Sequence, residues 1–278
     1  MTNSFKLGLV QDTPVQGDIE MTLKLMEDYG RQANKEGIGL LIFPELFITG
    51  YFHELWERHP TPDDEMYWFS RLHAMAKREG LAIVCGHPSY RAQTMEHGNS
   101  RLTSKISGDC LPMYNAASLV SVTGVMGIYA KVHLWDQETK VFTPGDLFPV
   151  WDTPWGRLAV QVSFDMDFPE GARAAALQGA EVLVYPTGNY FPYCPWYRTY
   201  TLARAQENGI FVASANRIGK EFDLEFCGGS CAAHPEGRLL IESRMEAGLY
   251  TCDVHLGERS SNYFSYRKPG AYRILCGQ

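Results

Sequence analysis

Short runs of apolar residues recur along the chain, and many of them are almost uninterrupted. Such runs are typical of strands that are buried on both faces of a sheet. The pattern predicts strands over residues 6–10, 39–43, 81–85, 116–122, 127–132, 157–163, 181–185, 210–215, 238–241 and 248–254.

Four segments between these strands have the pattern of helices. In residues 18–33 the apolar residues recur every four positions, on one side of a helix; they are Met21, Leu25, Tyr29 and Ala33. A second helix is expected to begin after Thr61, because a threonine cap followed by proline and acidic residues suits a helix N-terminus. Its apolar stripe is predicted to contain Met66, Phe69, Leu72, Met75 and Ala76. A third helix opens at Pro169, and a fourth covers about 195–208.

The alternation of strands with helices indicates an α/β protein. In the last third of the chain, the turn sequences Pro235-Glu236-Gly237 and Glu246-Ala247-Gly248 separate strands directly, which is typical of antiparallel hairpins. No break in composition and no internal repeat divides the chain. We therefore predict a single domain over residues 1–278.

Composition and charge narrow the possible functions. A hydrophobic content of 45% and a charged content of 21% are ordinary for a globular protein. The net charge of −7 gives no basic footprint for nucleic acid or an anionic membrane surface. No apolar stretch approaches the roughly 20 residues that span a bilayer, and residues 1–10 lack a signal-peptide pattern. We expect a cytoplasmic protein with no nucleic-acid or membrane partner.

The seven cysteines are scattered and odd in number: Cys85, Cys110, Cys194, Cys227, Cys231, Cys252 and Cys276. Without a secretory signal they are expected to be reduced thiols. The spacing of Cys227, Cys231 and His234 suggests zinc, but it matches none of the usual structural patterns. We therefore expect neither a metal nor a cofactor.

Three predicted strands lead into a polar residue, namely Glu45, Lys131 and Ser163. The carboxyl ends of strands in α/β sheets are where ligands bind. Taken singly, each residue is more often a turn residue, a cap or a surface charge than a catalyst. Together, a carboxylate, an amine and a hydroxyl at three strand ends can converge on one site.

Longer motifs surround these three residues. They are Phe43-Pro44-Glu45-Leu46 with Gly50-Tyr51, Tyr129-Ala130-Lys131-Val132-His133-Leu134, Phe142-Thr143-Pro144-Gly145, Ser163-Phe164-Asp165-Met166-Asp167-Phe168-Pro169-Glu170, Arg204-Ala205-Gln206-Glu207-Asn208 and Ala215-Asn216-Arg217-Ile218-Gly219. In this order and spacing the chain resembles the nitrilase superfamily of carbon–nitrogen hydrolases. One such motif is a weak match, but the ordered set is strong and covers nearly the whole chain.

The resemblance implies a four-layer αββα sandwich and a Glu–Lys–Cys catalytic triad. Carried over by position, Glu45 is the general base and Lys131 is the cation beside the developing oxyanion. A further family glutamate falls on Glu138, which would orient the lysine and the leaving amine. The nucleophile falls on Ser163, where the family has cysteine. The resemblance also implies a homodimer or a higher homo-oligomer, paired through the helices after residue 163 and after Tyr190.

The chemistry of amide cleavage explains these residue types. A carboxylate such as Glu45 can deprotonate a thiol, and the thiolate attacks the amide carbonyl. Lys131 and the backbone N–H of Phe164 would stabilise the resulting oxyanion. Protonated Glu45 then gives its proton to the departing amine, and an activated water releases the acyl group.

A serine at the nucleophile position changes the functional expectation but not the expected fold. A hydroxyl is far less acidic than a thiol, so we expect severe loss of turnover with near-normal substrate binding. Three explanations stay open: a deliberate replacement of a native cysteine, a natural pseudoenzyme that binds amides, or a true serine amidase. We favour the first, because the other catalytic positions are intact. Ser163 lacks the flanking glycines of a G-x-S-x-G elbow, so a triad with His133 or His234 has no motif support.

The substrate pocket is expected beside these residues. The segment after residues 181–185 is rich in aromatic residues, and in the family it lines the substrate cleft. The predicted substrate-binding residues are Phe164, Tyr51, Asn189, Tyr190 and Trp196. For most of the aromatic cluster, a core or an interface patch is the more ordinary interpretation.

The residues that follow the nucleophile position bear on the substrate. Family members that recognise an α-carboxylate tend to carry an arginine there, whereas this chain has Met166 and Asp167, with Arg173 further along. We predict that the substrate is a small neutral or cationic amide, which is cleaved to a carboxylic acid and ammonia. An N-carbamoyl amine or amino acid is the alternative.

Overall fold

The computed structural model describes residues 4–51, 59–96, 99–103, 111–257 and 266–272. Two sheets of six strands form its centre. The first sheet contains β1 (Ser4–Gln11), β2 (Ile38–Ile42), β3 (Ala82–Ser89), β6 (Tyr114–Ser121), β7 (Gly124–Ala130) and β16 (Gly248–His255). The second contains β8 (Val150–Thr153), β9 (Gly156–Val160), β10 (Val182–Thr187), β11 (Phe211–Asn216), β14 (Cys231–Ala233) and β15 (Leu239–Glu242).

The strand order is β16-β1-β2-β3-β6-β7 in the first sheet and β15-β14-β11-β10-β9-β8 in the second. In each sheet three central strands are parallel, β1-β2-β3 and β9-β10-β11, and antiparallel strands flank them. Two hairpins lie outside the sheets, β4 (Ala92–Glu96) with β5 (Asn99–Thr103) and β12 (Ile218–Glu221) with β13 (Leu224–Cys227).

Side chains of alternating positions fill the space between the two sheets. Leu40 and Ile42 of β2 point into this core with Val184 of β10. Side chains along a strand alternate between faces. Leu41, between these two residues of β2, and Ile83 of β3 therefore face the helices instead. Both faces of the central strands are therefore buried, which is why their sequences are almost uninterrupted apolar runs.

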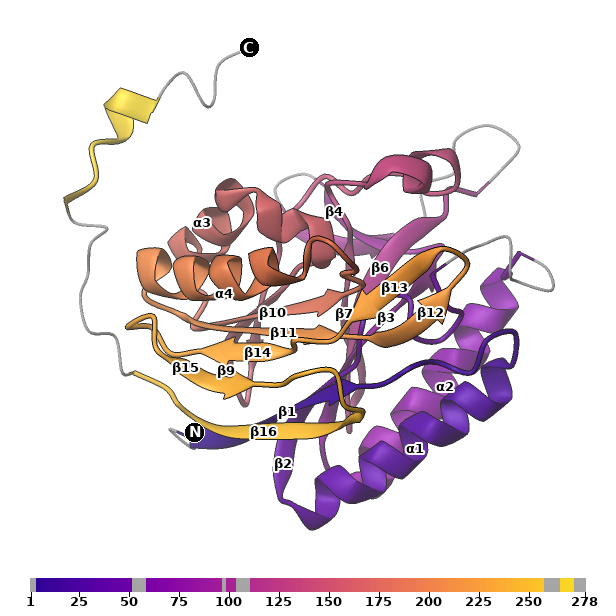
Figure 1. Cartoon of the computed structure of the whole chain (residues 1–278). Coiled ribbons are helices and arrows are strands. Elements are labelled where there is room, and N and C mark those ends of the chain that lie inside the picture. Colours follow the sequence, from indigo (N-terminus) through magenta and orange to yellow (C-terminus); the bar gives the residue numbers. More distant parts are fainter. Residues whose placement is uncertain (1–3, 52–58, 97–98, 104–110, 258–265, 273–278) are drawn as a thin grey trace.

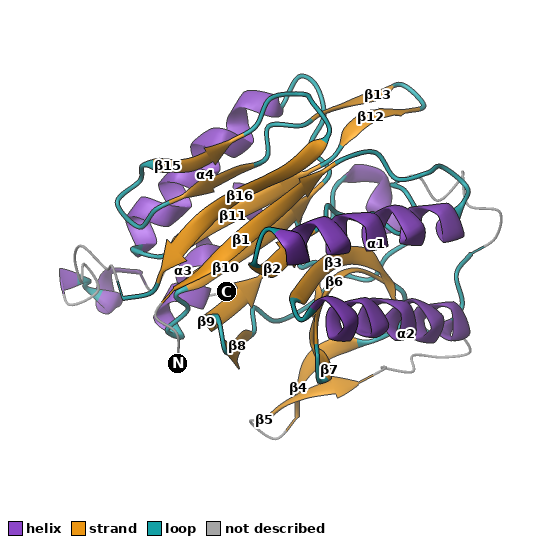
Figure 2. Ribbon diagram, turned by 90° about the horizontal axis from the view of Figure 1, so that it is seen from below, coloured by secondary structure: helices purple, strands orange, loops and turns teal. Residues whose placement is uncertain are grey.

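Two pairs of helices cover the outer faces of the sheets (Figure 1, Figure 2). Helices α1 (Ile19–Lys35) and α2 (Pro62–Glu79) pack on the first sheet, and α3 (Pro169–Leu177) and α4 (Cys194–Asn208) pack on the second. Short 3₁₀ helices cover Asp136–Lys140, Ser163–Asp167 and Pro269–Tyr272. The expected four-layer αββα sandwich is confirmed. No helix of the described residues is long and apolar enough to cross a membrane.

The start of α2 follows the sequence prediction. The Thr61 hydroxyl accepts a hydrogen bond from the Asp64 N–H at 3.3 Å, and the Asp64 carboxylate accepts one from the Thr61 N–H at 2.7 Å. The predicted apolar stripes are wrong at their first positions, because Met21 and Met66 are about half exposed. Around a helix axis, residues four apart are turned by about +40° and residues three apart by about −60°, so a stripe with one constant step drifts off the buried face.

All ten predicted strands are present, with ends that differ by a few residues. The strand expected over 157–163 ends at Val160, and Ser163 lies in the following 3₁₀ helix. Six strands were not predicted: β4, β5, β8, β12, β13 and β14. They have three to five residues each, too few to show a period.

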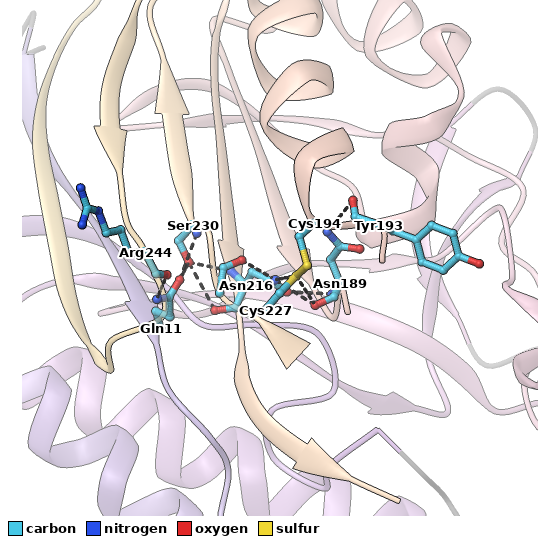
Figure 3. Close-up of a disulfide and its surroundings, with 9 residues drawn as sticks. Gln11, Asn189, Tyr193, Cys194, Asn216, Cys227, Ser230 and Arg244 are labelled. Atoms are coloured by element: carbon cyan, nitrogen blue, oxygen red, sulfur yellow. Dashed lines mark hydrogen bonds between the residues drawn. A yellow bond between two sulfur atoms is a disulfide. The ribbon is translucent and has the colours of Figure 1, made fainter. Parts of the chain in front are cut away.

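Two of the cysteines differ from the expectation of reduced thiols. Cys194, the first residue of α4, forms a disulfide with Cys227, the last residue of β13 (Figure 3). Their Cα atoms are 6.0 Å apart although 33 positions separate them in the sequence, so only the fold brings them together. Cys227 is therefore not available to the suggested zinc ligand set. The free cysteines of the described residues are Cys85, Cys231 and Cys252, while Cys110 and Cys276 lie outside these residues.

Breaking this disulfide should destabilise the fold. A cross-link that closes a loop of this length is worth about 3–4 kcal/mol in the chain-entropy model. We expect Cys194→Ser to lower the free energy of unfolding by about that amount in urea titrations without reductant. Cys252→Ser, which removes a free and partly buried thiol on β16, is the matched control and should change it by much less. Reductant should destabilise the unmodified chain but not Cys194→Ser; an unmodified chain that is insensitive to reductant would contradict the prediction.

Candidate active site

Three of the predicted catalytic residues meet at one point between the sheets. Glu45 follows β2, Lys131 follows β7, and Glu138 lies in the 3₁₀ helix Asp136–Lys140. The Lys131 ammonium lies 2.6 Å from Oε1 of Glu45 and 2.8 Å from Oε1 of Glu138. All three side chains are buried. The structure therefore brings two carboxylates against one ammonium at the carboxyl ends of the strands.

The backbone around Glu45 is held by both sheets. The Glu45 N–H donates to the carbonyl of Thr187, which ends β10, and the Gly86 N–H donates to the carbonyl of Pro44. A Cβ atom at Gly86 would lie 2.5 Å from the backbone nitrogen of Leu46. Only glycine lets β3 pass this close to the turn. The backbone position of Glu45 is therefore set by main-chain contacts with both sheets and does not depend on its side chain.

The charges of this cluster depend on one another. Burial lowers the pKa of Lys131, but Glu138 and Glu45 outweigh it, and the net pKa lies above its ordinary range. Burial raises the pKa of Glu138, and Glu45 adds to this, while Lys131 opposes it. Lys131 therefore keeps its proton, which makes it a fixed positive charge rather than a base.

The sequence analysis missed Asn115 as a member of the cluster. Its side-chain N–H₂ donates to Oε1 of Glu45 at 2.8 Å and to Oε1 of Glu138 at 3.3 Å. The Tyr51 hydroxyl and the backbone N–H of Trp135 also donate to Glu138, at 3.1 and 2.9 Å. The one signal for Asn115 in the sequence was an amide in a strand made otherwise of apolar and small residues.

The two oxygens of Glu45 have different surroundings. Oε1 accepts from Lys131 and Asn115, whereas Oε2 is buried and has no hydrogen-bond partner among the described residues. Oε2 lies against Gly188, where an added Cβ would come within 2.8 Å of it. The Gly188 N–H points to the Ser163 hydroxyl at 3.4 Å. The free oxygen of Glu45 and the hydroxyl of Ser163 therefore border the same glycine.

Ser163 sits on a strained turn. Its φ is +43°, a left-handed value that non-glycine residues seldom adopt. Asp165 holds the turn, because its Oδ2 accepts from the Val162 N–H and the Tyr129 hydroxyl. Its Oδ1 accepts from the backbone N–H of His133 and lies 2.8 Å from the His133 ring. His133 is thus engaged with Asp165, and the Ser163 hydroxyl instead lies 3.4 Å from that of Tyr197.

A pocket that is partly open to solvent leads to Ser163. It is lined by Tyr51, Lys131, Trp135, Ser163, Phe164, Asp167, Gly188, Asn189, Tyr190, Tyr193, Trp196 and Tyr197. All five residues predicted to bind substrate are in this lining. Trp135, Gly188, Tyr193, Tyr197 and Asp167 were not predicted to bind substrate. Glu45 and Glu138 are not part of the lining and contact its Lys131.

A hydrogen-bond network fixes the pocket wall at Asn189 (Figure 3). Its N–H donates to the side-chain oxygen of Asn216 at 2.7 Å, and its carbonyl accepts from the Asn216 amide at 3.0 Å. The Cys227 N–H donates to the same carbonyl, and the Asn189 side chain donates to the carbonyl of Tyr193. The network and the disulfide at Cys194 therefore tie the wall to β11 and β13.

Comparison with known proteins identifies relatives of this chain in sequence and in structure. A family model described as carbon-nitrogen hydrolase matches residues 6–261. A nitrilase of Pyrococcus abyssi is 34% identical over 260 residues, which cover 90% of each chain. An (R)-stereoselective amidase of a Pseudomonas species is 39% identical over 220 residues, 79% of this chain and 74% of the relative. Among solved structures, a cysteine-to-alanine variant of the Nesterenkonia AN1 amidase from the nitrilase superfamily superposes with a TM-score of 0.83. It is 30% identical and covers 98% of this chain and 97% of the amidase.

Removing the ammonium should leave two buried carboxylates unpaired. We expect Lys131→Met to lower the free energy of unfolding by about 3–5 kcal/mol near neutral pH. The pKa of Glu138, which burial already raises, would rise further without Lys131, whereas unfolded glutamate titrates at about 4.3. The loss should therefore be small below that pH and grow as pH rises through the raised folded value of Glu138.

Urea unfolding at about pH 5 and about pH 8 measures this difference. Lys220→Met is the matched control, because its ion pair with Glu225 is exposed on both sides and is worth little. Equal losses in the two variants, or a loss in Lys131→Met that does not depend on pH, would rule out the interpretation.

Proposed function

Because the chain belongs to the carbon–nitrogen hydrolase family, we propose that its pocket binds a small non-peptide amide. The site is arranged to cleave that amide to a carboxylic acid and ammonia through Glu45, Lys131 and a nucleophile at residue 163. Glu138 orients Lys131 and the leaving amine.

The observation that supports this proposal most strongly is the unpaired Oε2 of Glu45. A buried carboxylate oxygen without a donor is costly, since it has lost its water and gained nothing in return. A proton-bearing nucleophile at residue 163, on the other side of Gly188, would supply the missing donor. Glu45 is therefore placed to take a proton from the nucleophile and to return it to the leaving amine.

Lys131 supplies positive charge rather than proton transfer. Its raised pKa keeps it protonated throughout the reaction. It lines the same pocket as Ser163, so it can stabilise the oxyanion that forms when the amide carbonyl is attacked. We assign the second donor to the backbone N–H of Phe164. Since this charge is fixed in a buried site, no reorganisation is needed as the oxyanion develops.

Ser163 occupies the nucleophile position in this proposal, and the hydroxyl limits the reaction. A carboxylate is too weak a base to deprotonate a serine efficiently, whereas a thiol suits it. Structures of the Nesterenkonia amidase include a cysteine-to-serine variant and a covalent adduct of an acetamide moiety at the active-site cysteine. Others hold acrylamide or butyramide, which supports small aliphatic amides as ligands here. The present chain would then bind such amides far better than it cleaves them.

Restoring a thiol should restore activity. We expect Ser163→Cys to release ammonia from butyramide at least about 10³-fold faster than the unmodified chain, since loss of a nucleophile usually costs more than this. Ser163→Ala is the inactive control. Adding Glu45→Gln to Ser163→Cys should abolish the gain, because the general base is lost.

One result with Ser163→Cys would contradict the proposed amidase activity. If Ser163→Cys released no ammonia from aliphatic, aromatic or carbamoyl amides while still binding them, the protein would be an amide-binding protein and not an amidase.

A further inference from the structure

Asp167 lies in the pocket, and the mechanism above does not use it. It is the last residue of the 3₁₀ helix that begins with Ser163, four positions away. Among the described residues that line the pocket, Lys131 and Asp167 carry the charges. A carboxylate this close to the reacting group must either be satisfied by the protein or be available to a ligand.

The protein satisfies Asp167 only in part. The hydroxyls of Tyr200 and Tyr197 form hydrogen bonds with its carboxylate. Its Oδ1, however, is buried and has no hydrogen-bond partner among the described residues. Burial raises the pKa of Asp167 despite these tyrosines and nearby positive charge, as expected for a carboxylate that lacks donors.

Arg204 is the nearest fixed cation on α4, but its donors are directed elsewhere. Two of its nitrogens donate to the backbone carbonyl of Met166 at 2.9 and 3.2 Å, and one donates to that of Asp167 at 3.3 Å. A third nitrogen lies 3.1 Å from the carboxylate of Glu207. Arg204 therefore holds the backbone of the turn and gives Oδ1 of Asp167 no hydrogen bond.

The geometry sets how far Asp167 lies from the reaction centre. The Tyr197 hydroxyl is 3.4 Å from the Ser163 hydroxyl and also contacts the Asp167 carboxylate. Two successive hydrogen bonds put the carboxylate within roughly 6 Å of the nucleophile. A carbonyl carbon poised for attack lies about 3 Å from that nucleophile. The remaining span fits an ammonium that is separated from the carbonyl by one or two methylene groups.

The charges near the nucleophile also favour a substrate with a positive charge. The ammonium of Lys131 is already paired with Glu45 and Glu138. With Asp167, three carboxylic groups surround one fixed positive charge, so a substrate carboxylate would be repelled. The aromatic rings of Tyr193 and Trp196 on the pocket wall add faces that attract cations.

We propose that Asp167 is a specificity-determining residue that binds a primary ammonium on the acyl side of the amide. The preferred ligands are thus short amino-acyl amides such as β-alaninamide. The inference rests on the proposed function, because it assumes that the amide carbonyl lies at residue 163.

Calorimetric titration of the unmodified chain tests this pairing directly. The probes are β-alaninamide and butyramide, which have the same length and differ by an ammonium in place of a methyl group. We expect β-alaninamide to bind at least about tenfold more tightly, since a hydrogen bond to a charged group is worth that much. In Asp167→Asn this preference should disappear, while the affinity for butyramide changes by less than about twofold. Asp152→Asn, at a side chain that is 89% exposed and outside the pocket, is the matched control and should keep the preference.

The outcomes separate this inference from the proposed function. Butyramide that binds as well as β-alaninamide, or a preference that survives in Asp167→Asn, overturns the role of Asp167 and leaves the amidase proposal in place. Binding of neither amide overturns both. The comparison of the two amides on the unmodified chain needs no variant, so it decides the matter even if Asp167→Asn does not fold.

Discussion

The buried contact of Lys131 with Glu45 and Glu138 is the interaction on which the site depends. Each of these charges alone would be prohibitively expensive between two sheets, because water is absent and nothing replaces it. Together they are tolerated, but only if three separate elements deliver their side chains to within hydrogen-bond distance. The close approach of β3 at Gly86 and the end of β7 therefore serve this one contact, and the surrounding core keeps it in register.

The same contact decides which atoms are available for chemistry. Lys131 and Asn115 occupy only one oxygen of Glu45, and the other lies against Gly188, whose N–H points to the Ser163 hydroxyl. In the proposed reaction, a single glutamate thus anchors the cluster through Oε1 and acts as the base through Oε2. The lysine is held in its charged form by the carboxylates that it pairs, so base and cation are assigned by position rather than by residue type.

Much of this arrangement can be predicted from the sequence, for physical reasons. Strands buried on both faces must be apolar at every position, so the central strands and the polar residues at their ends stand out. The Thr61 cap marks the start of helix α2 in the sequence. Asn115 could not be found this way, because it belongs to a regular element and reaches the site only when the sheets pack. The disulfide of Cys194 was missed for the same reason, since nothing in its spacing marks Cys227 as its partner.

The charge cluster and the pocket wall are held in place in different ways. The charge cluster lies on strand ends and is buried, so its geometry is set by the whole sandwich. The pocket wall at Asn189 follows the end of β10, where the Asn216 side chain satisfies the backbone N–H and carbonyl of Asn189, and the disulfide adds a covalent tie. Asp167 belongs to neither group, because it sits on the turn that also carries Ser163. A ligand group held by Asp167 is therefore fixed relative to the nucleophile itself, and binding at that carboxylate would align the amide for attack rather than merely retain it in the pocket.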